Sequence, residues 1–153
     1  GMGMAVTFVM VLASVATWVL WNFIFVPLGL EYLQIMVFIL VIAVLVQLLE
    51  AILKKTVPNL YQAMGIYLPL ITTNCAILAV TFFGVDYHYN LIQVVIYSVG
   101  VALGFTIALL LLAGIREKLR FSKVPQFFQG SPIVFFSTCL LAIAFMGFKG
   151  LVK

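Results

Sequence analysis

The stretch LQIMVFILVIAVLVQLLEAIL, residues 33–53, decides the class of this protein. It holds a single charged residue, Glu50, and it is long enough for a helix to cross the hydrocarbon core of a bilayer. The rest of the chain has the same character, since 66% of its residues are hydrophobic, 8% are charged, and the mean hydropathy is +1.31. So few charges cannot cover a water-facing surface, so we predict an all-α, polytopic membrane protein.

Five stretches of this kind predict five membrane spans in one transmembrane domain, residues 1–153. The breaks between them carry Pro, Gly or Asn, and we expect them at Pro27–Gly29, Pro58–Asn59, Gly84–Asn90 and Gly130–Pro132. The expected spans run from about Gly3 to Phe25, Leu33 to Leu53, Met64 to Phe83, Leu91 to Ile115 and Pro132 to Phe148.

Basic residues mark one side of the predicted membrane domain. The positive-inside rule puts the two basic inter-span segments in the cytoplasm, and Glu31, Asp86 and the C-terminus outside. This clustering is typical of topology determinants rather than of a nucleic-acid surface, so no nucleic-acid partner is expected. The segments hold Lys54, Lys55, Arg116, Lys118, Arg120 and Lys123.

A short internal repeat suggests two inverted halves. The pattern G-x-A-x-x-F occurs at Gly3–Phe8 and again at Gly100–Phe105, in spans that begin on opposite sides of the membrane. Inverted repeats are a common plan in membrane transport proteins. The first half would then retain residues 1–53 and the second would cover residues 64–153, so we expect a six-helix bundle whose first helix precedes Gly1.

The third span contains the one polar run at mid-depth. Pro69 is followed by Thr72, Thr73, Asn74 and Cys75, and polar residues at the bilayer midplane are costly and tend to be functional. Membrane proteins build broken helices around sites in this way. In the plain alternative, the threonine hydroxyls bond to helix carbonyls freed by Pro69, and Cys75 is a small buried side chain.

The run LPLITTNCA, residues 68–76, resembles the signature of the A-type subunit family of Rnf ion-translocating electron-transport complexes. It is also similar to the related E-type subunit of the Na⁺-translocating NADH:quinone reductase. The similarity extends along the chain, through FILVIAV at 38–44, Gln47 and Glu50, GIREKL at 114–119, and AFMGF at 144–148.

The resemblance implies a six-span component of a multisubunit ferredoxin:NAD oxidoreductase in the bacterial cytoplasmic (inner) membrane, coupled to Na⁺ or H⁺ translocation. It implies a homologous partner of opposite topology and a [2Fe-2S] cluster at mid-membrane, held by two cysteines from each of the two proteins. Cys75 matches one ligand, and the second belongs to a helix expected before Gly1. Cys139 matches no ligand and is expected to be a packing residue.

Further polar groups surround the expected ligand. Iron–sulfur clusters are normally held by four cysteine thiolates and tuned by hydrogen bonds, so two cysteines on different spans need partner ligands. We expect Thr72, Thr73, Asn74 and Ala76 to surround the cluster, with backbone N–H groups near Thr73, Asn74 and Ala76 donating to its sulfurs.

Glu50 is the only acid inside a predicted span. It either pairs with Lys54 four residues later or handles the coupled cation. No trusted nucleotide or flavin signature occurs, so flavin, NAD and other Fe–S chemistry is assigned to partner proteins. Two other functions stay open: a secondary transporter with its site at the third span, and a purely structural membrane protein.

Overall fold

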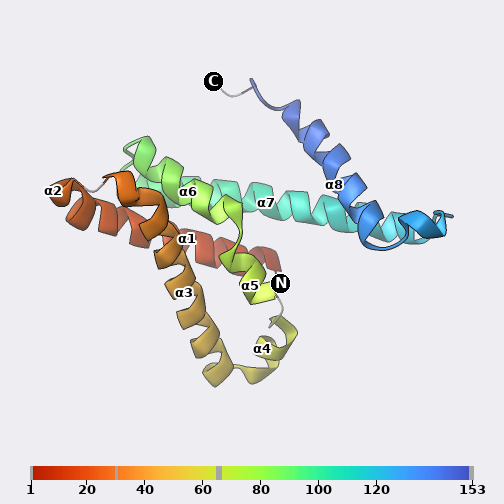
Figure 1. The fold of residues 1–153 in the computed structure, drawn as a ribbon, viewed down its shortest axis with the longest axis horizontal. Helices are drawn as coiled ribbons and strands as arrows, with labels where there is room; N and C mark the ends of the chain where they lie inside the picture. Colours follow the sequence, from red (N-terminus) through yellow and green to blue (C-terminus); the bar gives the residue numbers. More distant parts are fainter. Residues whose placement is uncertain (1, 30, 65–66, 152–153) are drawn as a thin grey trace. The chain divides into compact units, whose positions relative to one another are not determined.

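A computed structural model describes residues 2–29, 31–64 and 67–151, and these residues form helices joined by short turns (Figure 1). No strand occurs within these ranges, which confirms the all-α prediction. The elements are α1 (Met2–Leu20), the π-helix η1 (Trp21–Phe25), α2 (Val26–Leu28), the 3₁₀ helix η2 (Glu31–Leu33), α3 (Gln34–Thr56), α4 (Pro58–Met64), α5 (Tyr67–Thr72), α6 (Cys75–Asp86), α7 (Leu91–Arg120), the 3₁₀ helix η3 (Gln126–Phe128) and α8 (Ser131–Met146).

Four segments of the described chain are long and apolar enough to cross a membrane: Met2–Leu28, Gln34–Thr56, Leu68–Asp86 and Leu91–Arg120. The fifth predicted span forms α8, an apolar helix of 16 residues. At 1.5 Å per residue α8 is about 24 Å long, short of the roughly 30 Å hydrocarbon core. Four predicted spans therefore agree with the structure in place and character, and a fifth crossing stays a prediction.

Two of the predicted boundaries need correction. Gly84 does not begin a loop, because it lies buried inside α6, where an added Cβ would meet a Val94 methyl group at 3.5 Å. That distance is an ordinary van der Waals contact, so α6 and α7 pack closely here and an alanine would also fit. At the other end of α7, Arg116 to Arg120 continue the helix instead of forming a loop. Basic residues at a helix C-terminus are favoured by the helix dipole.

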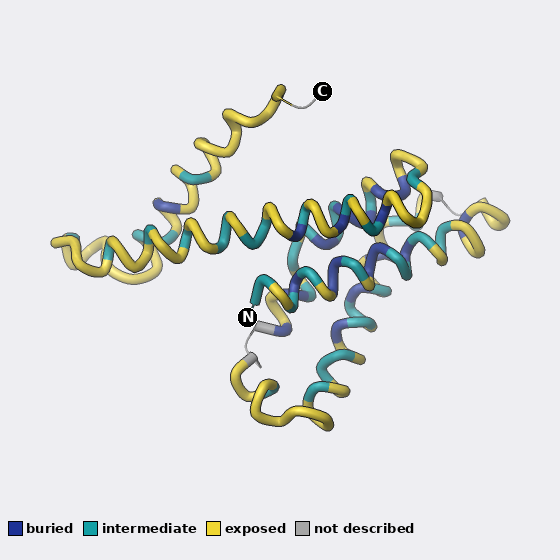
Figure 2. Tube along the Cα trace, turned by 180° about the vertical axis from the view of Figure 1, so that it is seen from behind, coloured by how far each residue is buried: buried dark blue, intermediate teal, exposed yellow. Residues whose placement is uncertain are grey.

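The chain divides into two compact units, which we call the N-terminal unit (residues 1–105) and the C-terminal unit (residues 106–153). The N-terminal unit is built on α1, which contacts α3, α5 and α6. In Figure 2 the buried positions follow the faces that these helices turn toward one another. This core is formed by Val6, Val9, Met10, Ala13, Ile42, Val46, Leu68, Ile71, Ile77, Val80 and Ala102.

Polar groups inside the N-terminal unit are paired rather than left open to lipid. The Ser98 hydroxyl of α7 donates to the Ser14 hydroxyl of α1 across 2.7 Å, and both side chains are fully buried. The Trp18 indole donates to the Tyr89 carbonyl at 2.9 Å and holds the turn after α6. The two units are not the halves of the predicted repeat, which are defined by sequence and stay a prediction.

Candidate functional site

The third span is interrupted between Thr72 and Cys75. The α5 helix ends at Thr72, Asn74 is extended with φ −78° and ψ 114°, and α6 begins at Cys75. The Asn74 side-chain oxygen accepts a hydrogen bond from the Ala76 N–H at 3.0 Å. This is an asparagine N-cap, which satisfies one of the N–H groups that a helix start leaves without a partner. The predicted helix break is therefore present.

Pro69 is not what breaks the span, contrary to the prediction. It lies within α5 (Tyr67–Thr72), three residues before the helix ends. Proline disturbs mainly the helical turn that precedes it, because its ring clashes with the carbonyl four residues earlier. The helix ends three residues later, at Thr72, and Thr73 and Asn74 then leave the helical path.

The polar groups around the break bond within the chain. The Thr72 hydroxyl donates to the Leu68 carbonyl at 3.2 Å, and the Thr73 hydroxyl donates to the Pro69 carbonyl at 3.1 Å. Backbone bonds add to these, from Thr73 N–H to the Pro69 carbonyl and from Asn74 N–H to the Ile71 carbonyl, both at 3.2 Å. An unsatisfied backbone group in a bilayer costs several kcal/mol, so these bonds allow the interruption to persist in lipid.

These bonds correct one expectation about the candidate site. The N–H groups of Thr73, Asn74 and Ala76 were expected to donate to cluster sulfurs, but all three donate to oxygens of this chain. The chain tightens after α5 and Asn74 caps α6, so these three N–H groups already have acceptors. As the plain alternative predicted, the threonine hydroxyls bond to backbone carbonyls. These are the Leu68 and Pro69 carbonyls of α5.

Cys75 is the first residue of α6 and its side chain is exposed. The span Leu68–Asp86 has its midpoint at Ile77, two residues further along the chain. Ile71 and Ile77 on either side of the break are fully buried in the core of the N-terminal unit. The break therefore holds an exposed thiol at mid-span between two anchored residues, at the helix end whose partial charge favours anions.

The donor set around Cys75 fits one ligand of a larger site. Within the described ranges, no group of three or more His, Cys, Asp or Glu residues is placed to hold a metal ion. A cluster at Cys75 therefore needs ligands from outside these residues. Its thiol is of the type that iron–sulfur clusters use.

Cys139 lies within α8 and is also exposed. The packing role predicted for it is therefore not fulfilled by the described part of this chain. The reason is that Ser137 is the single residue of α8 that is buried. An exposed cysteine on an apolar helix faces whatever covers that helix in the membrane.

Glu50 does not pair with Lys54, contrary to the simpler prediction. Its carboxylate accepts a hydrogen bond from the Tyr61 hydroxyl at 3.1 Å, and the Lys54 ammonium lies 5.8 Å from the centroid of the Tyr61 ring. The α4 helix turns the chain back after α3 and brings Tyr61 to both residues. The bond to Glu50 and its negative charge raise the pKa of Tyr61 above the usual 10.0.

Comparison of this sequence with known proteins identifies its relatives. A family model described as "Rnf-Nqr subunit, membrane protein" matches residues 1–152. The A-type subunit of the Na(+)-translocating ferredoxin:NAD(+) oxidoreductase complex of Acetobacterium woodii is 56% identical over 99% of this chain and 79% of its own length. The A-type subunits of the ion-translocating oxidoreductase complexes of Syntrophotalea carbinolica and Serratia proteamaculans are 55% and 53% identical. These matches cover 99% and 100% of this chain, and 79% of each relative.

Proposed function

The chain belongs to the Rnf-Nqr family of membrane subunits, and from that premise we propose that it supplies Cys75 as a ligand to a [2Fe-2S] cluster in an ion-translocating oxidoreductase complex. One observation carries the proposal: the third span is interrupted and leaves an exposed cysteine at the start of α6. The hydrogen bonds at the break do not use the thiol, because Asn74 caps α6 and the Thr73 and Asn74 N–H groups bond to α5 carbonyls.

The chain's own residues would orient and protect the ligand. Buried Ile71 and Ile77 fix the backbone on both sides of Cys75 and so hold its sulfur in place. The start of α6 offers partial positive charge to a negatively charged cluster. Thr72, Thr73 and Asn74 act indirectly, by holding the backbone in its broken course. When bound, such a cluster transfers single electrons.

The proposal includes partners and a location. Cys75 needs further cysteine ligands from outside the described residues, among them ligands from a homologous partner of opposite topology. Flavin and other Fe–S centres belong to additional proteins of the complex, which works between ferredoxin and NAD in the bacterial inner membrane. The basic residues at the ends of α3 and α7 would face the cytoplasm. Asp86 and the C-terminus would lie on the other side of the membrane.

The test is Cys75→Ser in the intact complex, with Cys139→Ser as the matched control. Cys75→Ser should lower the iron content by one cluster and stop electron transfer across the membrane, because serine offers a poor ligand to iron. Cys139→Ser should keep the normal iron content and the normal rate of electron transfer. Normal iron and normal rates in Cys75→Ser would contradict the proposal, and substrate flux through the purified chain alone would favour a transporter instead.

A further inference from the structure

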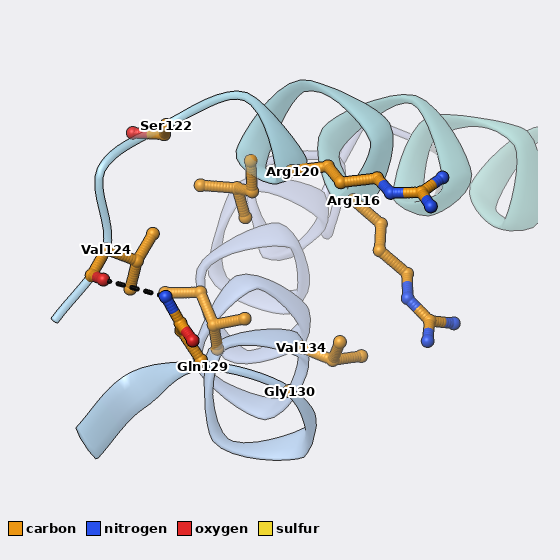
Figure 3. Close-up of a pocket in the computed structure, with 9 residues that line it drawn as sticks. Arg116, Arg120, Ser122, Val124, Gln129, Gly130 and Val134 are labelled. Atoms are coloured by element: carbon orange, nitrogen blue, oxygen red, sulfur yellow. Dashed lines mark hydrogen bonds between the residues drawn. The ribbon is translucent and has the colours of Figure 1, made fainter. Parts of the chain in front are cut away.

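Two arginines of the C-terminal unit have no part in the electron transfer proposed above. Arg116 and Arg120 are four residues apart near the end of α7, a spacing that puts them on the same face of the helix. Neither has an acidic partner within 4.0 Å in the part of the chain that the structure describes. Figure 3 shows both guanidinium groups extending to the same side of α7.

The two arginines line a cavity of about 440 Å³ at the end of α7. The loop that follows α7 closes part of this cavity, since Gln129 donates from its side chain to the Val124 carbonyl at 3.2 Å (Figure 3). Gly130, with φ +85°, then turns the chain into α8. Ser122 and Gln129 add polar groups to the lining. The cavity thus presents two positive charges and neutral donors to a ligand.

An apolar groove of about 420 Å³ continues from this cavity between α7 and α8. The two hollows share Leu119 and Ile133, so they meet at one wall. Ile115, Phe136 and Leu140 line the groove further along the helices. A positively charged cavity therefore lies beside an apolar groove, both at the end of a membrane-length helix.

We propose that this pair of hollows binds one anionic phospholipid. The phosphate would lie between Arg116 and Arg120, because guanidinium groups bind phosphate oxygens through paired hydrogen bonds. One acyl chain would fill the groove lined by Leu119, Ile133 and Leu140. Basic pockets between membrane helices near the aqueous boundary bind anionic headgroups in this way. The inference is independent of the cluster, because its residues belong to the other unit.

The experiment is a titration of the intact complex with phosphatidylglycerol or phosphatidylcholine, followed by native mass spectrometry. The wild-type complex should bind phosphatidylglycerol more tightly than phosphatidylcholine. The double variant Arg116→Gln/Arg120→Gln should weaken that binding about fivefold for each arginine, roughly 25-fold together. The control Lys54→Gln/Lys55→Gln removes the same charge elsewhere and should change phosphatidylglycerol affinity by less than about twofold. If the double variant does not assemble, Arg116→Lys and Arg120→Lys should each weaken binding, since lysine lacks the paired donors.

Two further measurements separate a lipid from other ligands. Ala144→Trp, which fills the groove, should weaken binding of long-chain phosphatidylglycerol but not of its short-chain form. Inorganic phosphate in excess should fail to displace the long-chain lipid. Equal phosphatidylglycerol binding by the wild type and the arginine variants would overturn the proposal. Displacement by phosphate alone would reduce the site to a simple anion site, and loss of a partner protein with unchanged lipid binding would make it a protein interface.

Discussion

Two apolar spans of the same chain take different courses through the membrane. The α7 helix runs for 30 residues without interruption, although it contains Gly100, Gly104 and Gly114. The span Leu68–Asp86 is interrupted after Thr72, at a point that holds neither glycine nor proline. Glycine alone therefore does not interrupt α7, while the other span breaks at Thr73 and Asn74.

The difference lies in what replaces the lost helix bonds. In lipid, every backbone group needs a partner from the protein, so glycine alone gives a helix no reason to end. At the break, the Asn74 side chain caps α6, and the Thr73 and Asn74 N–H groups bond to α5 carbonyls. A span breaks where side chains can satisfy it, and here that point coincides with Cys75.

The largest effect should come from moving the cysteine by one residue. Cys75→Ala combined with Ala76→Cys keeps the composition of the break but rotates the thiol by about 100° around α6. We expect the cluster to be lost, because ligand geometry tolerates no such displacement. Iron content of the intact complex measures this, with Cys139→Ala as control. Full iron in the shifted variant would mean that the position of the break is irrelevant to the thiol.

Removing the cap should have the next largest effect. Asn74→Leu leaves the Ala76 N–H without its acceptor, so the complex should lose about 1–2 kcal/mol of stability. The cluster should remain with a shifted reduction potential. Thermal unfolding and a redox titration measure the two changes. Asn74→Ser keeps an acceptor at the cap and should stay close to the wild type; equal losses in both variants would exclude capping as the cause.

Replacing the proline should matter less. Pro69→Ala leaves the Asn74 cap in place, so the break should persist and stability should change by under about 1 kcal/mol. Electron-transfer rate and thermal unfolding are the measurements. If Pro69→Ala disturbed the cluster as strongly as Asn74→Leu, then proline rather than the cap would hold the span open.

The smallest effect concerns Glu50. Glu50→Gln keeps an oxygen for the Tyr61 hydroxyl but removes the charge, so the pKa of Tyr61 should fall back toward 10.0. Because the folded pKa is raised, the protonated phenol stabilises the native state fully below pH 10.0, and that contribution is lost as the pH rises through the raised pKa.

Ultraviolet difference titration of the tyrosines measures this shift, and activity at neutral pH should stay near normal. Tyr61→Phe identifies the titrating group, because the shifted signal should disappear in that variant. Loss of ion-coupled turnover in Glu50→Gln with the cluster intact would instead assign Glu50 to cation handling.

The sequence predicted the membrane class and the location of the break, because both depend on local composition. It did not predict the cause of the break, since Pro69 is the stronger signal in the sequence while Asn74 acts through a bond visible only in three dimensions. The predicted ion pair between Glu50 and Lys54 is wrong for a similar reason. The α4 helix brings Tyr61 back to Glu50, and nothing in residues 50–54 indicates that contact.

The arginine cavity was also missed. Arg116 and Arg120 were interpreted as topology determinants in a loop, whereas the structure continues α7 through both. Their spacing of four residues was the available signal, but it has meaning only on a helix. The groove lined by α8 could not be predicted, because it depends on how two helices pack after an intervening loop.

The EPR spectrum of the chemically reduced intact complex tests the role of Cys75 most directly. The wild type and Cys139→Ser should give the same [2Fe-2S] signal, while Cys75→Ser should lose it or display clearly altered g-values, because a ligand to iron has changed. An unaltered signal in Cys75→Ser, at wild-type intensity, would contradict the assignment of Cys75 as a cluster ligand.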